Sequence, residues 1–126
     1  MSKPMPSSTT LEAFIARVEA NAHVEAIRDF YADDASMREN FDPPRVGRDR
    51  LIAHEANAME RVASVRSECV RPVFVSGDRV VIRWIFEFEF KDGRRGRIEE
   101  LAYQRWEGER VAEEQFFYDP AQFAPR

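Results

Sequence analysis

Three short glycine-containing turns divide the second half of the chain, and they constrain its fold more than any other feature. They are Ser76-Gly77-Asp78, Asp92-Gly93 and Glu107-Gly108, each lying between runs rich in apolar residues. Turns of this composition connect neighbouring strands in β-hairpins. They therefore predict four strands in a meandering antiparallel sheet, over residues 65–75, 79–91, 95–106 and 109–118.

The first half of the chain is expected to be mainly helical. Apolar residues recur at helical spacing from Leu11 and again from Val24, which indicates two amphipathic helices with a tight joint between them. Thr9-x-x-Glu12 has the spacing of a helix capping box. A short strand is expected over residues 35–40, followed by a third helix from Arg48 to Val62.

Helices followed by a meandering sheet indicate an α+β fold, with three N-terminal helices packed on one face of a strongly curved antiparallel sheet. The cleft between two such layers is a usual place for a small-molecule site. The length of 126 residues fits a single hydrophobic core. We therefore divide the chain into a flexible N-terminus, 1–8, which is rich in Pro and Ser, and one domain, 9–126.

Composition excludes several classes of function. The net charge of −4 argues against nucleic acid as a partner, because such binding requires Lys and Arg to neutralise phosphates. No segment has the apolar length of a membrane span or the pattern of a signal peptide. The single cysteine, Cys69, excludes an internal disulfide and a multi-cysteine metal site. We expect a cytoplasmic protein with no nucleic-acid or membrane partner, no cofactor and no metal, in which Cys69 is buried.

The pairing of residues 79–91 with 95–106 determines which side chains share a face, because a slip of one residue reverses every side chain. A simple turn at Asp92-Gly93 places Trp84 opposite Leu101. A bulge near Gly96 places Trp84 opposite Ala102. We prefer the bulge, because it sets large residues against small ones and explains the glycine. The resulting inner face is partly aromatic and partly polar, and it includes Trp84, Phe86, Glu100, Gln104, Glu113 and Gln115.

Two carboxylates are the leading candidates for chemistry. Glu55 lies in the middle of the apolar stripe of the third helix, so it is expected either to form a salt bridge with an arginine of the sheet or to serve as a pocket acid. Glu39 ends the short first strand on the same face as Met37. Partial burial there raises the pKa of a carboxyl group and suits a general base or acid, whereas the alternative is a solvated side chain.

The remaining polar residues give weaker signals. Glu100 and Glu113 are expected either to share a proton or to face an arginine. His54 lies near the edge of the third helix's apolar stripe, and His23 is expected to be exposed at the joint between the first two helices. The two histidines do not have the spacing of zinc ligands.

The order of motifs resembles the SnoaL-like and ketosteroid isomerase-like branch of the nuclear transport factor 2-like superfamily. The resemblance extends from about residue 10 to residue 123. It is carried by Phe30-Tyr31-Ala32-Asp33-Asp34-Ala35, Pro44-x-x-Gly47, the strand from Arg79 to Trp84, Trp106-Glu107-Gly108-Glu109-Arg110-Val111 and Phe117-Tyr118-Asp119-Pro120. The resemblance implies a cone-shaped, cystatin-like fold.

The resemblance also bears on the site. In the isomerase branch a catalytic Asp stands two residues after a strand position like Met37, and Glu39 occupies that place here. The positions that supply an oxyanion hole in that branch correspond to Ile15 and Ala102. Neither side chain donates a hydrogen bond, so steroid isomerisation of that type is not expected.

We therefore expect a small-molecule enzyme of the isomerase, cyclase or hydrolase type, in which Glu39 or Glu55 transfers a proton to or from a hydrophobic substrate. The alternative is a non-catalytic ligand-binding or dimeric accessory module. The predicted pocket comprises Tyr31, Trp84, Phe86, Glu100, Gln104, Glu113 and Gln115.

A homodimer is expected through the outer face of the sheet, because a monomer would expose large apolar groups there. The alternative is that the C-terminal tail, from Pro120 to Arg126, covers part of this face. The predicted dimer face comprises Val81, Arg83, Ile85, Leu101, Tyr103, Ala112, Phe116 and Tyr118.

Overall fold

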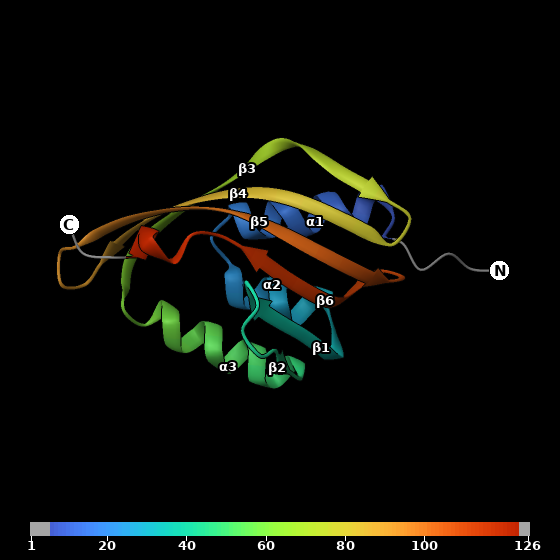
Figure 1. Cartoon of the computed structure of the whole chain (residues 1–126), viewed down its shortest axis with the longest axis horizontal. Helices are drawn as coiled ribbons and strands as arrows, with labels where there is room; N and C mark the ends of the chain where they lie inside the picture. Colours follow the sequence, from blue (N-terminus) through green and yellow to red (C-terminus); the bar gives the residue numbers. More distant parts are fainter. Residues whose placement is uncertain (1–5, 124–126) are drawn as a thin grey trace.

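A curved sheet of six strands arches over three helices in the computed structural model, which describes residues 6–123 (Figure 1). The α+β fold is as predicted. The helices are α1 (Ser8–Glu19), α2 (His23–Phe30) and α3 (Arg48–Met59). The strands are β1 (Tyr31–Glu39), β2 (Arg45–Val46), β3 (Val62–Ser76), β4 (Arg79–Phe90), β5 (Arg95–Glu107) and β6 (Arg110–Phe117), and a short 3-10 helix η1 (Pro120–Phe123) follows.

The first helix begins earlier than the predicted capping box. The Ser7 hydroxyl accepts a hydrogen bond from the Thr10 N–H at 3.1 Å, so Ser7 is the N-cap of α1. Glu12 instead forms an ion pair with Arg71 of β3, at 2.6 Å. Of the segment predicted to be flexible, residues 1–5 lie outside the described residues, and Ser7 and Ser8 form the cap and the first residue of α1.

The strand order is β2-β1-β6-β5-β4-β3. The four C-terminal strands form the predicted antiparallel meander. Strand β1 starts at Tyr31, earlier than expected, and pairs with β6 in parallel, with Met37 opposite Glu114. The chain after α2 thus returns to the open edge of β6 and extends the sheet beside the helices.

The hairpin of β4 and β5 differs from both registers considered from the sequence. Trp84 lies opposite Glu100 and Gly96 opposite Phe88, so there is no bulge at Gly96. The extra residue lies in the turn instead, where the Phe90 N–H donates to the Arg94 carbonyl at 2.8 Å and Gly93 has a φ of 89°. This is a three-residue loop with its glycine in the left-handed region. The shift relative to the preferred register is an even number of residues, so the predicted inner faces of β4 and β5 are preserved.

A bulge in β6 reverses the predicted face of that strand beyond Val111. Trp106 pairs with Val111 but Arg105 pairs with Glu113, so Ala112 is the extra residue and is buried. Glu114 therefore points inward. Glu113 and Gln115 lie on the other face, and their prediction as pocket residues is wrong.

The core lies between the helices and the inner face of the sheet. Phe14 of α1 packs edge-on against Trp106, with ring centroids 5.8 Å apart, and Ile15 is 1% exposed. Cys69 is a buried free thiol, as expected, and its burial raises the pKa of the thiol.

Substituting each of two glycines by alanine tests where the β4–β5 hairpin accommodates its extra residue. Gly93→Ala is expected to lower the free energy of unfolding by about 1–2 kcal/mol, because an L-residue is strained at positive φ. Gly96→Ala is the control, since its added Cβ meets only Phe90 at an ordinary 3.5 Å. Urea unfolding of both variants measures the difference. A larger loss for Gly96→Ala would contradict the register described above.

Candidate functional site

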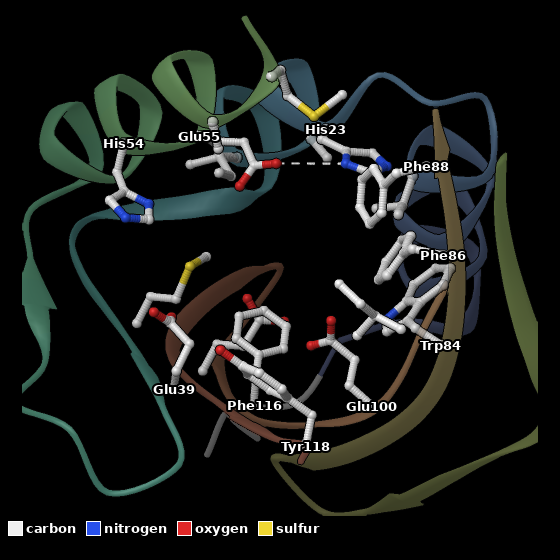
Figure 2. Close-up of a pocket in the computed structure, with 18 of the residues that line it drawn as sticks. His23, Glu39, His54, Glu55, Trp84, Phe86, Phe88, Glu100, Phe116 and Tyr118 are labelled. Atoms are coloured by element: carbon white, nitrogen blue, oxygen red, sulfur yellow. Dashed lines mark ion pairs between the residues drawn. The ribbon is translucent and has the colours of Figure 1, made fainter. Parts of the chain in front are cut away.

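A cavity of about 310 Å³ lies between α2, α3 and the inner face of the sheet (Figure 2). This volume is at the lower end of the range for small-molecule sites. Its walls are mainly apolar and aromatic, and four carboxyl groups, two imidazoles and one guanidinium also line them. These ionisable groups are Glu39, Glu55, Glu100, Glu114, His23, His54 and Arg45.

One wall is an aromatic strip along β4. Alternate residues of a strand share a face, so Trp84, Phe86, Phe88 and Phe90 all point inward. The Trp84 and Phe86 rings are stacked with centroids 5.6 Å apart, and the next two centroid distances are 6.2 and 5.8 Å. The strip gives the cavity a continuous π surface (Figure 2).

Glu100 of β5 directs its carboxyl group into the cavity (Figure 2). Within the described residues its side chain has no hydrogen-bond or ion-pair partner, and only burial and other carboxylates act on its charge. Its apolar surroundings, and after them the charges of Glu114, Glu55 and Glu39, raise the pKa of Glu100 to about 8. A carboxyl group with that pKa is mostly protonated at neutral pH, and it is therefore able to donate a proton.

Glu114 of β6 also lines the cavity, and it is only 3% exposed. It accepts hydrogen bonds from the Tyr31 hydroxyl and from Gln104 Nε2, the latter at 2.7 Å. Gln104 in turn accepts a hydrogen bond from Trp106 Nε1 at 2.9 Å. Burial outweighs these donors and raises the pKa of Glu114 to about 7. Burial, and after it the charge of Glu114, also raises the pKa of the Tyr31 hydroxyl well above its usual value.

Glu39 reaches the cavity from the end of β1 and is held by Arg45 of β2. The two guanidinium–carboxylate distances are 2.9 and 2.6 Å, which is a bidentate ion pair. The short strand β2 was not predicted from the sequence. Its partnership with β1 brings this arginine to the carboxylate that the sequence marked as a candidate base.

Glu55 points from α3 into the space between helix and sheet, as its place in the apolar stripe predicts. Its partner is His23, with Oε2 and Nδ1 3.5 Å apart, rather than the arginine of the sheet that was considered. The other ring nitrogen of His23 lies 2.8 Å from the Ser67 hydroxyl, which donates its proton to Asn21 at 2.9 Å. Ser67 therefore accepts a hydrogen bond from His23 Nε2.

The expectation that His23 is exposed is wrong, because its side chain is 11% exposed. The ring packs edge-on against Phe86 at 5.3 Å, between the start of α2 and the sheet. His54 is exposed, and its ring lies at the rim of the cavity.

The structure brings together six of the nine site residues proposed from the sequence. Glu39, Glu55, Tyr31, Trp84, Phe86 and Glu100 line the cavity. Gln104 is buried behind Glu114, and Glu113 and Gln115 face away. Sequence reasoning missed Glu114, His23 and Arg45, and the apolar spacing of β6 gave no sign of the bulge that turns Glu114 inward.

Neither a metal cluster nor a membrane helix is found in the part of the chain described. Residues 6–123 contain no group of three or more acidic, His or Cys side chains placed to hold a metal ion. Within the same range, no helix has the length and apolarity to cross a membrane.

The fold has counterparts among solved structures. A nuclear transport factor 2-like protein of unknown function from Burkholderia pseudomallei has 16% identity and a TM-score of 0.76, over 90% of this chain and 91% of its own. A protein described as a SnoaL-like polyketide cyclase, from Mesorhizobium loti, has 20% identity and a TM-score of 0.74, over 88% and 97%. A protein with the ketosteroid isomerase-like fold from Catenulispora acidiphila, solved with trimethylamine, has 16% identity and a TM-score of 0.76, over 92% and 89%.

At these identities the structural similarity establishes the fold alone. No curated protein matches the sequence. A family model of the SnoaL-like domain, however, matches residues 11–114, which is most of the chain. The protein therefore belongs to the SnoaL-like family and has the nuclear transport factor 2-like fold that its sequence motifs predict.

Proposed function

We propose that this protein is a small-molecule enzyme of the isomerase or cyclase type, and that Glu100 is its principal proton-transfer group. The observation that carries the proposal is the carboxyl group of Glu100, which faces an aromatic cavity with no partner among the described residues and has a pKa of about 8. A proton donor or acceptor works best when its pKa lies near the working pH. Membership of the SnoaL-like family supports the same class of activity.

The arrangement supports a two-sided proton transfer. Glu55 and Glu100 lie on opposite sides of the cavity with their carboxyl groups directed into it (Figure 2). Glu100 places its proton on a carbonyl oxygen while Glu55 or Glu39 removes a proton from the adjacent carbon, which gives an enol. In a ketone with a double bond beyond that carbon, the enol is a dienol. The base then returns the proton to the far carbon of the dienol while the enol proton returns to Glu100, which completes an isomerisation. The roles of Glu39 and Glu55 follow from the sequence and remain predictions.

A non-catalytic ligand-binding or accessory module is the second candidate. It is favoured by the ion pairs of Glu39 with Arg45 and of Glu55 with His23, because both carboxylates already have partners within the protein. In this case the cavity binds a small molecule without changing it.

We further propose a homodimer through the outer face of the sheet, in a reducing cytoplasmic setting consistent with the free thiol of Cys69. Phe74, Leu101 and Tyr103 are 63%, 44% and 38% exposed on or beside this face. Three members of the predicted dimer face are not available to a partner. Ala112 is buried, and Phe116 and Tyr118 line the cavity.

The described part of the C-terminal segment, which ends at residue 123, does not cover the outer face of the sheet. Gln122 hydrogen-bonds both backbone groups of Glu99, at 2.8 and 3.1 Å, where β5 extends past the end of β6. Phe123 packs edge-on against Tyr118, with ring centroids 5.6 Å apart, and lines the cavity. The exposed apolar groups are therefore left for a second copy of the chain.

Sedimentation equilibrium tests the dimer. At micromolar concentration we expect a species of about two chain masses, and Leu101→Lys is expected to convert it to one chain mass by placing charge in the interface. Val46→Lys is the control, because Val46 is 54% exposed on β2 at the far edge of the sheet. A wild-type protein that remains at one chain mass on concentration would exclude the dimer.

Proton exchange tests the role of Glu100 without knowledge of the natural substrate. In D₂O the protein is expected to accelerate deuterium uptake at the carbons beside the carbonyl group of benzylacetone, measured by NMR. Glu100→Gln is expected to lower this rate by about 100-fold or more, the usual contribution of a general acid or base. Glu113→Gln, which removes a carboxylate from the outer face, is expected to keep it. Full activity of Glu100→Gln with loss in Glu39→Gln or Glu55→Gln would move the role to those residues.

The raised pKa of Glu100 also makes stability depend on pH. Its pKa rises from 4.5 to about 8 on folding, so its full contribution to stability is present below pH 4.5 and is lost as the pH rises to about 8. The loss attributable to Glu100 is about 1.4 kcal/mol for each pH unit in that window. Urea unfolding of Glu100→Gln is expected to show a shallower decline than the wild type or Glu113→Gln. Equal declines would mean that Glu100 ionises normally.

A further inference from the structure

We propose that the ligand of this cavity is an organic cation, an ammonium group carried on an apolar body, with Glu100 as its counter-ion and the aromatic strip of β4 as its platform. The proposal rests on the function proposed above in taking the same cavity as the ligand site. It adds the chemical class of the ligand, and it stands on the distribution of charge and aromatic surface within the cavity.

The cavity contains more acids than its own cations can balance. The charged and titratable groups that line the cavity with Glu100 come from every surrounding element: His23 on α2, Glu55 and His54 on α3, Tyr31 and Glu39 on β1, Arg45 on β2, Glu114 on β6 and Tyr118 just after β6. The four carboxyl groups thus face a single guanidinium and two imidazoles. An ionised carboxylate inside an apolar cavity requires a compensating positive charge.

The basic groups that line the cavity are already engaged or lie at its rim. Both terminal nitrogens of Arg45 bind Glu39. The ring of His23 lies between Glu55 and Ser67, and His54 lies at the exposed rim. Among the described residues, Glu100 therefore has no positive partner, and a ligand is left to supply one.

The wall beside Glu100 suits a cation as well. Trp84 lies directly opposite Glu100 in the β4–β5 pair, and its ring continues into the rings of Phe86 and Phe88. Ammonium groups bind over aromatic faces, and Trp is the strongest partner for them. A cation in the cavity, over the inner face of these two strands, reaches the Glu100 carboxylate and the aromatic rings of β4 together.

The competing ligand classes use these features less well. An anion adds a further negative charge to a cavity that already holds unbalanced carboxyl groups. A neutral carbonyl compound accepts a hydrogen bond from protonated Glu100 but makes no use of the excess acid. The cation alone allows Glu100 to ionise, so its binding releases the proton of Glu100 to the solvent and leaves a carboxylate that can act as a base.

Three probes of similar shape test the class by isothermal titration calorimetry. They are benzyltrimethylammonium, the neutral ketone benzylacetone and the anion hydrocinnamate. The cation is expected to bind about tenfold or more tightly than either of the others at pH 8. Its charge is permanent, so any pH dependence of its binding belongs to the protein. We expect its affinity to rise by up to about tenfold per pH unit from pH 6 to pH 8, with release of about one proton at pH 7.

Two matched variants test whether Glu100 is responsible for binding the cation and for the pH dependence of that binding. Glu100→Gln is expected to lower the affinity for benzyltrimethylammonium by about tenfold or more and to flatten its pH dependence. Glu113→Gln is expected to leave both unchanged. Circular dichroism of each variant confirms that it is folded, and the pH profile of the wild type is an independent readout.

The outcomes separate this inference from the proposed activity. Tighter binding of the ketone or the anion, absence of binding by the cation, or an affinity for the cation that does not rise with pH each overturns the cationic ligand. If Glu100 is still required for deuterium exchange in benzylacetone, the proton-transfer role stands despite that result. If Glu100→Gln keeps the full rate of deuterium exchange while the wild type binds the cation as expected, only the proton-transfer role is overturned.

Discussion

The hydrogen bonds of Glu114 determine how three strands meet at the base of the cavity. This carboxyl group belongs to β6 and accepts hydrogen bonds from Tyr31 on β1 and Gln104 on β5. A buried carboxyl group without such donors costs several kcal/mol or more, so the three strands are stabilised in one arrangement. The parallel pairing of β1 with β6 follows the same contacts. Because β1 is fixed there, Glu39 at its end reaches the cavity.

This network depends on a feature that the sequence does not mark. Glu114 points inward only because Ala112 is an extra residue in β6, and alanine has no conformational preference for a bulge. In the β4–β5 hairpin, glycine does indicate that an extra residue is present, but two glycines are candidates for its position. Gly93 and Gly96 both follow β4 closely, and only the positive φ at Gly93 distinguishes the one that absorbs the extra residue. The hairpins and the faces of β4 and β5 were predictable, since the two-residue period of a strand survives an even shift.

The candidate site was predictable where a single element carries the signal. Glu55 interrupts an apolar helical stripe, and alternation along β4 places Trp84 and Phe86 on one face. The contacts of His23 could not be found in this way, because its partner Ser67 lies 44 residues away on β3. The role of Arg45 could not be predicted either, because β2 is a strand of two residues and has no sequence pattern of its own. Long-range pairing, rather than local propensity, decides which polar groups share the cavity.

The carboxyl groups of the cavity fall into two pairs, one with cationic or titratable partners and one without. Glu39 and Glu55, which come from β1 and α3, each have a cationic or titratable partner nearby, whereas Glu100 and Glu114 on the central strands have only neutral donors or none among the described residues. Burial, and after it the charges of neighbouring carboxylates, raises the pKa of Glu100 to about 8 and that of Glu114 to about 7. The cavity thus keeps its protonated carboxyl groups on the central strands β5 and β6, and its ion pairs between α2 and α3 and at the β1–β2 edge. An apolar residue in place of Glu100 would remove a partly buried carboxyl group that has no partner among the described residues. Its presence beside an aromatic wall is therefore best explained by a ligand or a reaction that uses it.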